Sequence, residues 1–304
     1  MIKKIVRIIS RIYKIPGRLN RIQESLGRIE ARQTQNASTI ERAEFRVFSQ
    51  WGEDGIIQYL INRIECKNKT FIEFGVENYL ESNTRFLLTN NGWSGLVIDG
   101  SAKNIEYIKN DIIYWSSNLS AVHAFITKEN INELIGLNGL SGDIGLLSVD
   151  IDGNDYWVWS AINTVSPAIV IAEYNGQFGP IADVSVPYDP NFIRDRAHYS
   201  KVFYGASITA LSRLAKSKGY SLVGGNTAGN NAFFVRNDLL DGLKEVAPIQ
   251  VFQTTKFREF HDNHGKLTFH SFNQRYLLIR DLLVYDFKRG AIVKLREVEG
   301  VDKI

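Results

Sequence analysis

The sequence has little of several features that would place a protein in a class at once. Among its 304 residues the only cysteine is Cys66, which excludes an internal disulfide and a cysteine-based zinc site and fits a reducing cytosol. No apolar run approaches the roughly 18–20 residues that a membrane span needs, and no signal-peptide pattern is evident. The net charge of +3 is too small to indicate a nucleic-acid partner. These absences predict a cytoplasmic protein that binds no nucleic acid.

Two nucleotide-binding signatures are also missing, namely G-x-G-x-x-G and a phosphate loop that carries a lysine.

From residue 45 onward short apolar runs alternate with helical patterns, which predicts a mostly parallel sheet covered by helices on both faces. The last two runs are separated only by the glycine-rich segment 224–230, so we expect an antiparallel pair there. The predicted fold is a Rossmann-like α/β domain with seven strands and an antiparallel last strand. The predicted strands are 70–75, 95–99, 120–125, 144–150, 168–174, 219–223 and 231–236.

The chain is expected to have three parts. A helical extension covers 1–45, the α/β domain covers 46–238, and a C-terminal extension over 239–304 packs on the core. The last part shows a helical stretch at 272–283 and a turn signal at 288–290, which indicates a hairpin.

The extension over 1–45 is basic and amphipathic. Isoleucines recur at helical spacing through residues 1–15, Pro16-Gly17 breaks the pattern, and the stretch 18–32 has the apolar spacing of a short coiled coil. One interpretation is peripheral contact of residues 1–15 with the inner face of a membrane, together with a homo-oligomer formed through residues 18–32. The other interpretation is a pair of helices packed on the catalytic domain.

The first motif with chemical content is the run from Phe71 to Glu77, in which Glu73 stands two residues before Gly75 at the end of a buried strand. Without a phosphate loop, such acidic side chains suit a ligand that is positively charged and carries no phosphate, and S-adenosylmethionine is one. The alternative is that Glu73 caps a helix or pairs with Arg85. The other residues expected around the methionine end of this cofactor are Glu77, Ser82 and Asn83.

The second motif, Asp99-Gly100-Ser101, ends the next predicted strand. A carboxylate at the end of such a strand can accept hydrogen bonds from a ribose diol, so the three residues are predicted to bind the nucleoside. Ser101 is also placed to cap the following helix, and an ordinary turn acid is the alternative for Asp99.

The third and fourth motifs end two further strands, where Asp150 and Asp152 follow one apolar run and Glu173 and Asn175 follow the next. In a parallel sheet both motifs emerge at the same edge. Their oxygen atoms form a hard ligand set suited to Mg²⁺ or Mn²⁺. Two alternatives stay open, since one carboxylate could act as a metal-free general base, or the acids could only order loops. Asp150 is also expected near the cofactor.

A long connection over 174–204 is expected to contact the acceptor. It holds His198, which we expect to act with Asp152 and Glu173 in catalysis, because an imidazole titrates near neutral pH. The histidines of the tail, His261, His264 and His270, fit no metal-ligand spacing and are expected at the surface.

Over residues 45–238 the order of these motifs resembles the class I S-adenosylmethionine-dependent methyltransferases, and more narrowly the FkbM-like group. The resemblance places Glu73 and Gly75 at the methionine end, Asp99 at the ribose, and Asp150 and Asp152 in the motif of the fourth strand. The chain departs from that pattern in having a single glycine in the first loop and Asp-Ile-Asp-Gly where FkbM-like proteins show Asp-x-Glu-Gly. The second form also resembles metal-dependent macrolide-sugar methyltransferases.

The resemblance implies O-methylation of a sugar or nucleotide-sugar in capsule, lipopolysaccharide or other glycan biosynthesis. One alternative is a non-catalytic glycan-assembly scaffold at the membrane surface, against which the acids at the strand ends argue. Another is a nucleotide-sugar dehydrogenase or epimerase. The missing G-x-G-x-x-G and the absence of a well-placed Tyr-x-x-x-Lys pair argue against it.

Overall fold

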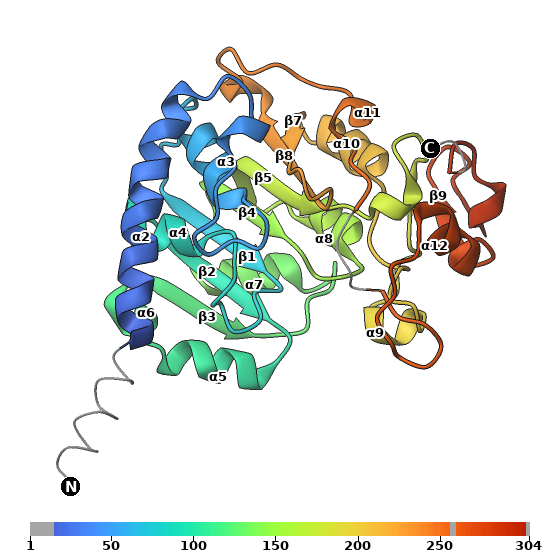
Figure 1. Cartoon of the computed structure of the whole chain (residues 1–304), viewed down its shortest axis with the longest axis horizontal. Helices are drawn as coiled ribbons and strands as arrows, with labels where there is room; N and C mark the ends of the chain where they lie inside the picture. The colour runs from blue at the N-terminus through green and yellow to red at the C-terminus, as the bar shows by residue number, and fades with distance from the viewer. Residues whose placement is uncertain (1–14, 256–259, 302–304) are drawn as a thin grey trace, which may run out of the picture.

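The computed structural model describes residues 15–255 and 260–301 (Figure 1). The segment predicted to contact a membrane, 1–15, therefore lies outside the described residues except for Ile15. Within the described ranges, no helix combines the length and the apolar character needed to cross a membrane.

A seven-stranded sheet in the order β3-β2-β1-β4-β5-β8-β7 forms the centre of the molecule. All neighbouring strands run parallel except for β8, which lies antiparallel to both β5 and β7. The predicted Rossmann-like sheet with one antiparallel strand is thereby confirmed. The strands are β1 (Thr70–Phe74), β2 (Ser94–Asp99), β3 (Leu119–His123), β4 (Gly142–Val149), β5 (Val165–Glu173), β7 (Tyr220–Gly225) and β8 (Asn231–Arg236).

The central strands are buried on both faces, because successive side chains enter two different cores. Ile72 and Leu96 join one hydrophobic cluster, whereas their neighbours Phe71 and Val97 join the other. The first cluster also holds side chains of α7 (Ile131–Leu137), α8 (Asp155–Ala161) and α10 (Ile208–Ser217). The second holds side chains of α3 (Glu53–Ile61), α4 (Arg85–Asn91), α5 (Ala102–Asn110) and α6 (Ile112–Ser116).

A second, three-stranded sheet joins the C-terminal extension to the long connection after β5. It consists of β6 (Val184–Ser185), β9 (Leu283–Asp286) and β10 (Ala291–Lys294), in the order β10-β9-β6. The predicted tail helix is α12 (Phe272–Ile279), and the predicted hairpin is β9–β10. The two-residue strand β6 gives no periodic signal in the sequence. The remaining short helices are α9 (Arg194–Ala197), α11 (Pro248–Val251), η1 (Thr34–Asn36), η2 (Glu41–Ala43), η3 (Gly176–Phe178), η4 (Asn237–Leu239) and η5 (Leu295–Glu297).

The helix α2 (Ile15–Gln33) lies along one side of the body (Figure 1). Pro16 and Gly17 lie in the first turn of the described part of this helix. The expectation that they separate it from another helix concerns residues 1–14, which lie outside the described residues. The small side chain of Ala31 packs on the body, in a cluster with Phe45 and Phe86.

Candidate active site

A cavity of about 650 Å³ opens at the carboxyl ends of β1, β2, β4 and β5. In open α/β sheets this edge is where ligands bind. All the predicted cofactor residues line the cavity except Ser101, and of the predicted catalytic residues Asp152 and Glu173 line it but His198 does not. The lining includes the polar side chains of Glu73, Asp99, Asp150, Asp152, Glu173, Arg194, Asn231 and His261, together with Gly75.

Glu73, at the end of β1, is buried and fastens the segment that leads into α4. Its Oε1 accepts a hydrogen bond from the Asn83 backbone N–H at 2.8 Å, and its Oε2 accepts from the Thr84 backbone N–H at 3.1 Å and from the Thr84 hydroxyl. Burial raises the pKa of Glu73 to about 7 in spite of these donors. Glu73 thus accepts hydrogen bonds from the backbone just before α4, as the helix-capping alternative proposed. Arg85, the partner in the other alternative, donates to the Tyr79 carbonyl.

Gly75 follows directly and has a left-handed φ of +69°. A Cβ at this position would lie 1.7 Å from the carbonyl oxygen of Asp150. The glycine is needed because the loops after β1 and β4 cross here, and not only because a ligand approaches the backbone.

Asp99 ends β2 and organises two loops with one carboxylate. Its Oδ2 accepts from the Glu77 backbone N–H at 2.8 Å, while its Oδ1 accepts from the Ser101 N–H at 2.8 Å and from Asn104 Nδ2 at 3.2 Å. The Ser101 hydroxyl accepts from the Asn104 N–H and so caps α5. Ser101 therefore serves the helix, and Asp99 and Gly100 are the members of this motif that face the cavity.

The loop after β4 is held by a buried acid that does not face the cavity. Asp155 Oδ1 accepts from the Ile151 N–H and Oδ2 from the Gly153 N–H, each at 2.8 Å. Burial raises the pKa of Asp155 to about 6. Between those two residues Asp152 adopts a left-handed φ of +56°, a conformation that Asp tolerates better than most residues. This turn brings the side chains of Asp150 and Asp152 to the same place.

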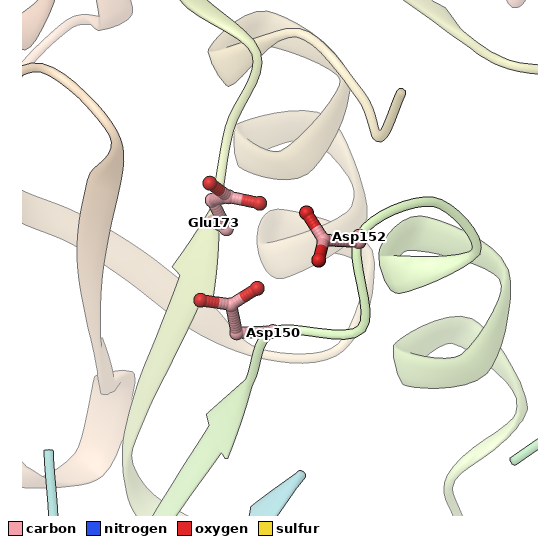
Figure 2. Close-up of side chains that lie close together, drawn as sticks. All are labelled: Asp150, Asp152 and Glu173. Atoms are coloured by element: carbon pink, nitrogen blue, oxygen red, sulfur yellow. The ribbon is translucent and has the colours of Figure 1, made fainter. Parts of the chain in front are cut away.

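Asp150, Asp152 and Glu173 form an acidic cluster in which one oxygen of each carboxylate lies within 4.8 Å of the others. Figure 2 shows the three carboxylates pointing toward one another from the ends of β4 and β5. Burial and then the charges of neighbouring acids raise the pKa of Asp150 and of Glu173 well above their usual ranges. One oxygen of Glu173, Oε2, is buried and has no hydrogen-bond partner within the described chain.

Arg194, the first residue of α9, is the cation at this cluster. Its Nη1 lies 2.5 Å from Asp152 Oδ1, and its guanidinium stacks on the Tyr204 ring at 3.8 Å. Phe192, two residues earlier, closes over the loop from the same side, since a Cβ on Gly153 would lie 2.2 Å from its ring. The connection after β5 thus covers the acidic cluster, as its length suggested.

Two predicted site residues, Asn175 and His198, do not line the cavity. Asn175 is buried and gives its amide to the backbone, donating to the carbonyls of Val202 and Tyr204 and accepting from the Gln177 N–H. It fixes both ends of the connection and does not line the cavity, so it is not part of the oxygen cluster. His198 stacks on Tyr199 at 4.3 Å and contacts Ser200 Oγ through Nδ1 at 2.7 Å. Burial lowers its pKa.

Several polar residues of the cavity were not predicted as site residues, among them His261, Asn231 and Asn154. His261 lines it, with a buried Nδ1 that has no hydrogen-bond partner among the described residues, although a surface position was expected. Asn231 stands opposite Glu173 in the β5–β8 pairing and donates to Glu53 at 2.9 Å, while Asn154 donates to the Asp189 carbonyl at 2.7 Å. The strand register that brings Asn231 beside Glu173 has no signature in the sequence.

No protein-family model matches the chain, and no curated protein matches its sequence. Among solved structures the fold is similar to the N-terminal domain of EvdMO1 with SAH bound, at 12% identity over 55% of this chain and 72% of that chain, with a TM-score of 0.37. It is also similar to an O-methyltransferase from Bacillus cereus in complex with SAH, at 14% identity over 55% and 72% of the two chains, with a TM-score of 0.35. An S-adenosylmethionine-dependent methyltransferase from Clostridium acetobutylicum ATCC 824 matches at 9% identity over 55% and 83%, with a TM-score of 0.35. Because these identities and scores are low, no function is transferred from those proteins to this chain.

Proposed function

We propose that the protein is an S-adenosylmethionine-dependent O-methyltransferase that acts on a hydroxyl of a sugar or nucleotide-sugar. The cavity at the carboxyl edge of the sheet would hold the cofactor over β1 and β2 and the acceptor over β4 and β5. The acidic cluster at the end of β4 and β5 would receive the acceptor.

The observation that carries the proposal is the contact made by Glu73. In dinucleotide-binding folds the amides at the start of the first helix after β1 hold a pyrophosphate. Here the amides of Asn83 and Thr84, directly before α4, already donate to Glu73, which also brings negative charge to this place. The arrangement repels a phosphate and suits a cofactor that carries an ammonium and a sulfonium group.

The charge of the whole lining agrees with this choice. Among the described residues, eight carboxyl side chains line the cavity, against the two cationic side chains Arg194 and Lys201. Both cations are paired, Arg194 with Asp152 and Lys201 with Asp195 at 2.8 Å. This balance favours the sugar over the diphosphate of a nucleotide-sugar as the part that enters the cavity.

Asp99 would hold the ribose. Its Oδ2 accepts only one hydrogen bond in the described structure, from Glu77, so this oxygen can accept a hydroxyl as well. The same bond ties the Glu77 loop to β2, and the nucleoside would therefore bind to a preformed wall of the cavity.

Glu173 and Asp150 would take the proton of the acceptor hydroxyl. Their raised pKa values make each a stronger base than an exposed carboxylate, because burial and like charge both favour the protonated form. Asp152 would orient the hydroxyl while Arg194 holds its carboxylate. When bound, S-adenosylmethionine supplies an activated methyl group, and the chain's part is therefore positioning and removal of a proton.

The acidic cluster also fits a divalent cation. Three carboxylates within 4.8 Å of one another, and a buried Glu173 Oε2 without a partner in the described chain, match the hard oxygen ligands that Mg²⁺ and Mn²⁺ prefer. Asp150, Asp152 and Glu173 would hold the ion, which would polarise an acceptor hydroxyl and lower its pKa.

Calorimetric titration with S-adenosylhomocysteine tests the cofactor part of the proposal. We expect binding by the wild type and loss of binding in Asp99→Ala. The matched control is Asp111→Ala, which removes an acid that caps α6 through the Ile113 N–H but does not line the cavity. A folded wild-type sample that binds no S-adenosylhomocysteine would contradict the proposal.

The acceptor is tested by incubation with S-adenosylmethionine and a panel of sugars and nucleotide-sugars, followed by mass spectrometry for a gain of one methyl group. Parallel reactions with Mg²⁺, with Mn²⁺ and with a chelator separate the metal-assisted from the metal-free form. Unchanged turnover after exhaustive chelation would remove the metal, whereas methylation of only nitrogen acceptors would overturn the assignment to hydroxyl groups.

A further inference from the structure

The helix α2 carries a stripe of large apolar side chains that faces solvent. Ile15, Leu19, Ile22, Leu26 and Ile29 follow one another at intervals of four and three residues, and each is 48–57% exposed. This spacing is that of positions a and d in a heptad repeat, with leucine at the a positions and isoleucine at the d positions. We refer to these five residues as the α2 seam.

The opposite face of α2 packs on the body, and the α2 seam therefore faces away from the body. Gly27 and Ala31 are buried against the body, and a Cβ on Gly27 would lie 2.3 Å from Val47 Cγ2. Thr34, beyond the end of the helix, is also buried. Only small residues fit this contact, so the helix cannot rotate to bury its leucines and isoleucines in the body.

We propose that the α2 seam binds the same seam of another copy of this chain, as a parallel coiled coil. Gly27, Ala31 and Thr34 occupy positions b and f, away from the seam, so each copy can keep its body on the outside of the helix bundle. Gln23, at position e beside the seam, donates to the Val47 carbonyl of its own body. Figure 1 shows α2 at the side of the molecule, with the body on one side of it only.

The charges beside the α2 seam favour the parallel direction. In a parallel pair, Arg18 at a g position faces Gln23 at an e position of the other copy, and Ser25 faces Glu30, so no like charges meet. In an antiparallel pair with the same core, Arg18 would face Arg32 of the other copy. Leucine at a with isoleucine at d further favours association of more than two helices.

The width of the stripe distinguishes a second copy from a membrane surface. A helix that lies on a bilayer presents a broad apolar face, whereas a stripe limited to positions a and d is the narrower seam of a coiled coil. Here Arg18, Gln23, Ser25 and Glu30 border the seam, and all four are exposed. These polar side chains would have to enter the apolar layer if a lipid surface covered the stripe.

Sedimentation velocity of the full chain tests the proposal. We expect the wild type to sediment with a mass that is a multiple of 34.5 kDa. Ile22→Asp/Leu26→Asp should sediment as a single chain, while the control Arg21→Asp/Arg28→Asp, with two aspartates on the same helix outside the seam, should keep the larger mass. Equal circular dichroism of the variants would show that the fold is intact.

A single-chain mass for the wild type, or an unchanged mass for the seam variant, would overturn the proposal. Co-sedimentation of a single-chain wild type with phosphatidylserine vesicles would instead assign the stripe to a membrane. For direction, Ile22→Cys in a Cys66→Ser background should form a disulfide between copies under mild oxidation. A disulfide that forms only when Ile22→Cys is mixed with Leu26→Cys would show antiparallel pairing and contradict the parallel arrangement.

Discussion

Two pairs of acids at the same edge of the sheet differ in what surrounds their carboxylates. Glu73 and Asp99, after β1 and β2, accept hydrogen bonds from backbone N–H groups on both carboxylate oxygens. Asp150 and Glu173, after β4 and β5, lie beside each other and beside Asp152, and Glu173 Oε2 has no partner in the described chain. The first pair stabilises its loops, whereas the second pair is held in an arrangement of like charges.

This difference separates acids that hold loops in place from acids for which the described structure shows no such role. A carboxylate that accepts several backbone N–H donors fixes the loops that carry those donors, as Glu73 and Asp99 do. Carboxylates forced together without such donors raise the free energy of the folded state, and they persist where the site needs them. The acidic cluster is therefore the part of the cavity for which a structural explanation is weakest.

The largest effect is expected at Gly75, where the two regions touch. Gly75→Ala would place a Cβ 1.7 Å from the Asp150 carbonyl oxygen, and we expect a loss of roughly 3 kcal/mol or more in the free energy of unfolding. Gly92→Ala is the matched control, because its φ is +65° but nothing lies within 4 Å of the added Cβ. It should cost only about 1 kcal/mol in urea unfolding, and equal losses in the two variants would show that the loops do not cross tightly at Gly75.

Neutralising one acid of each pair should change stability in opposite directions. Glu173→Gln removes a like charge from the acidic cluster, and we expect the free energy of unfolding to rise by about 1 kcal/mol while methyl transfer falls by roughly 10²-fold or more. Asp99→Asn places an amide against an N–H donor of Glu77 or Ser101, and we expect a loss of roughly 1–3 kcal/mol. Urea unfolding with a chelator present measures the free energy of unfolding of both variants. A loss of stability in Glu173→Gln would contradict the expected difference between the two pairs of acids.

Stability should fall as the pH rises across the neutral range. A carboxyl whose pKa is raised by folding holds a proton that the unfolded chain has already released. Its contribution to the free energy of unfolding is therefore complete at a pH below the pKa of the unfolded chain, and it is lost as the pH rises through the pKa of the folded state. Asp150 and Glu173 shift in this direction, and Glu73 titrates at about 7 instead of 4.5. We expect a higher melting temperature at pH 5.5 than at pH 8.

Glu173→Gln provides the comparison for the pH effect. It should reduce the difference between the two melting temperatures, because it removes a titrating group whose pKa is raised by burial and by the charge of Asp150. Melting curves with a chelator present measure this, and an equal or larger difference in the variant would show that the acidic cluster does not contribute.

The smallest effect is expected for the two histidines His198 and His261. His261 lines the cavity and His198 does not, so His261→Ala should lower methyl transfer more than His198→Ala. We expect His198→Ala to remain within a few-fold of the wild type, since loss of a general base typically costs about 10²–10⁴-fold. Initial rates at saturating cofactor measure both, and a large loss in His198→Ala alone would restore His198 as the base.

Much of the fold could be predicted because the strands are buried on both faces and read as continuous apolar runs. The seven predicted strands all exist, and the glycine-rich segment 224–230 correctly indicated the antiparallel pair. The strand β6 was missed because it has two residues, too few for a period, and its partner β9 lies far away in the sequence. Pairings at long sequence separation leave no local pattern to recognise.

Local sequence patterns already show that acids end four strands, and these acids meet because the carboxyl ends of parallel strands share one edge of the sheet. Which acids receive backbone donors and which face one another depends on the three-dimensional packing of the loops. This packing also placed Asn175 in the backbone network of the connection after β5, kept His198 out of the cavity and brought His261 in. The physical reason is that hydrogen-bond partners and neighbouring charges are set by loops packed from distant parts of the chain, whereas strand order and burial follow from local apolar patterns.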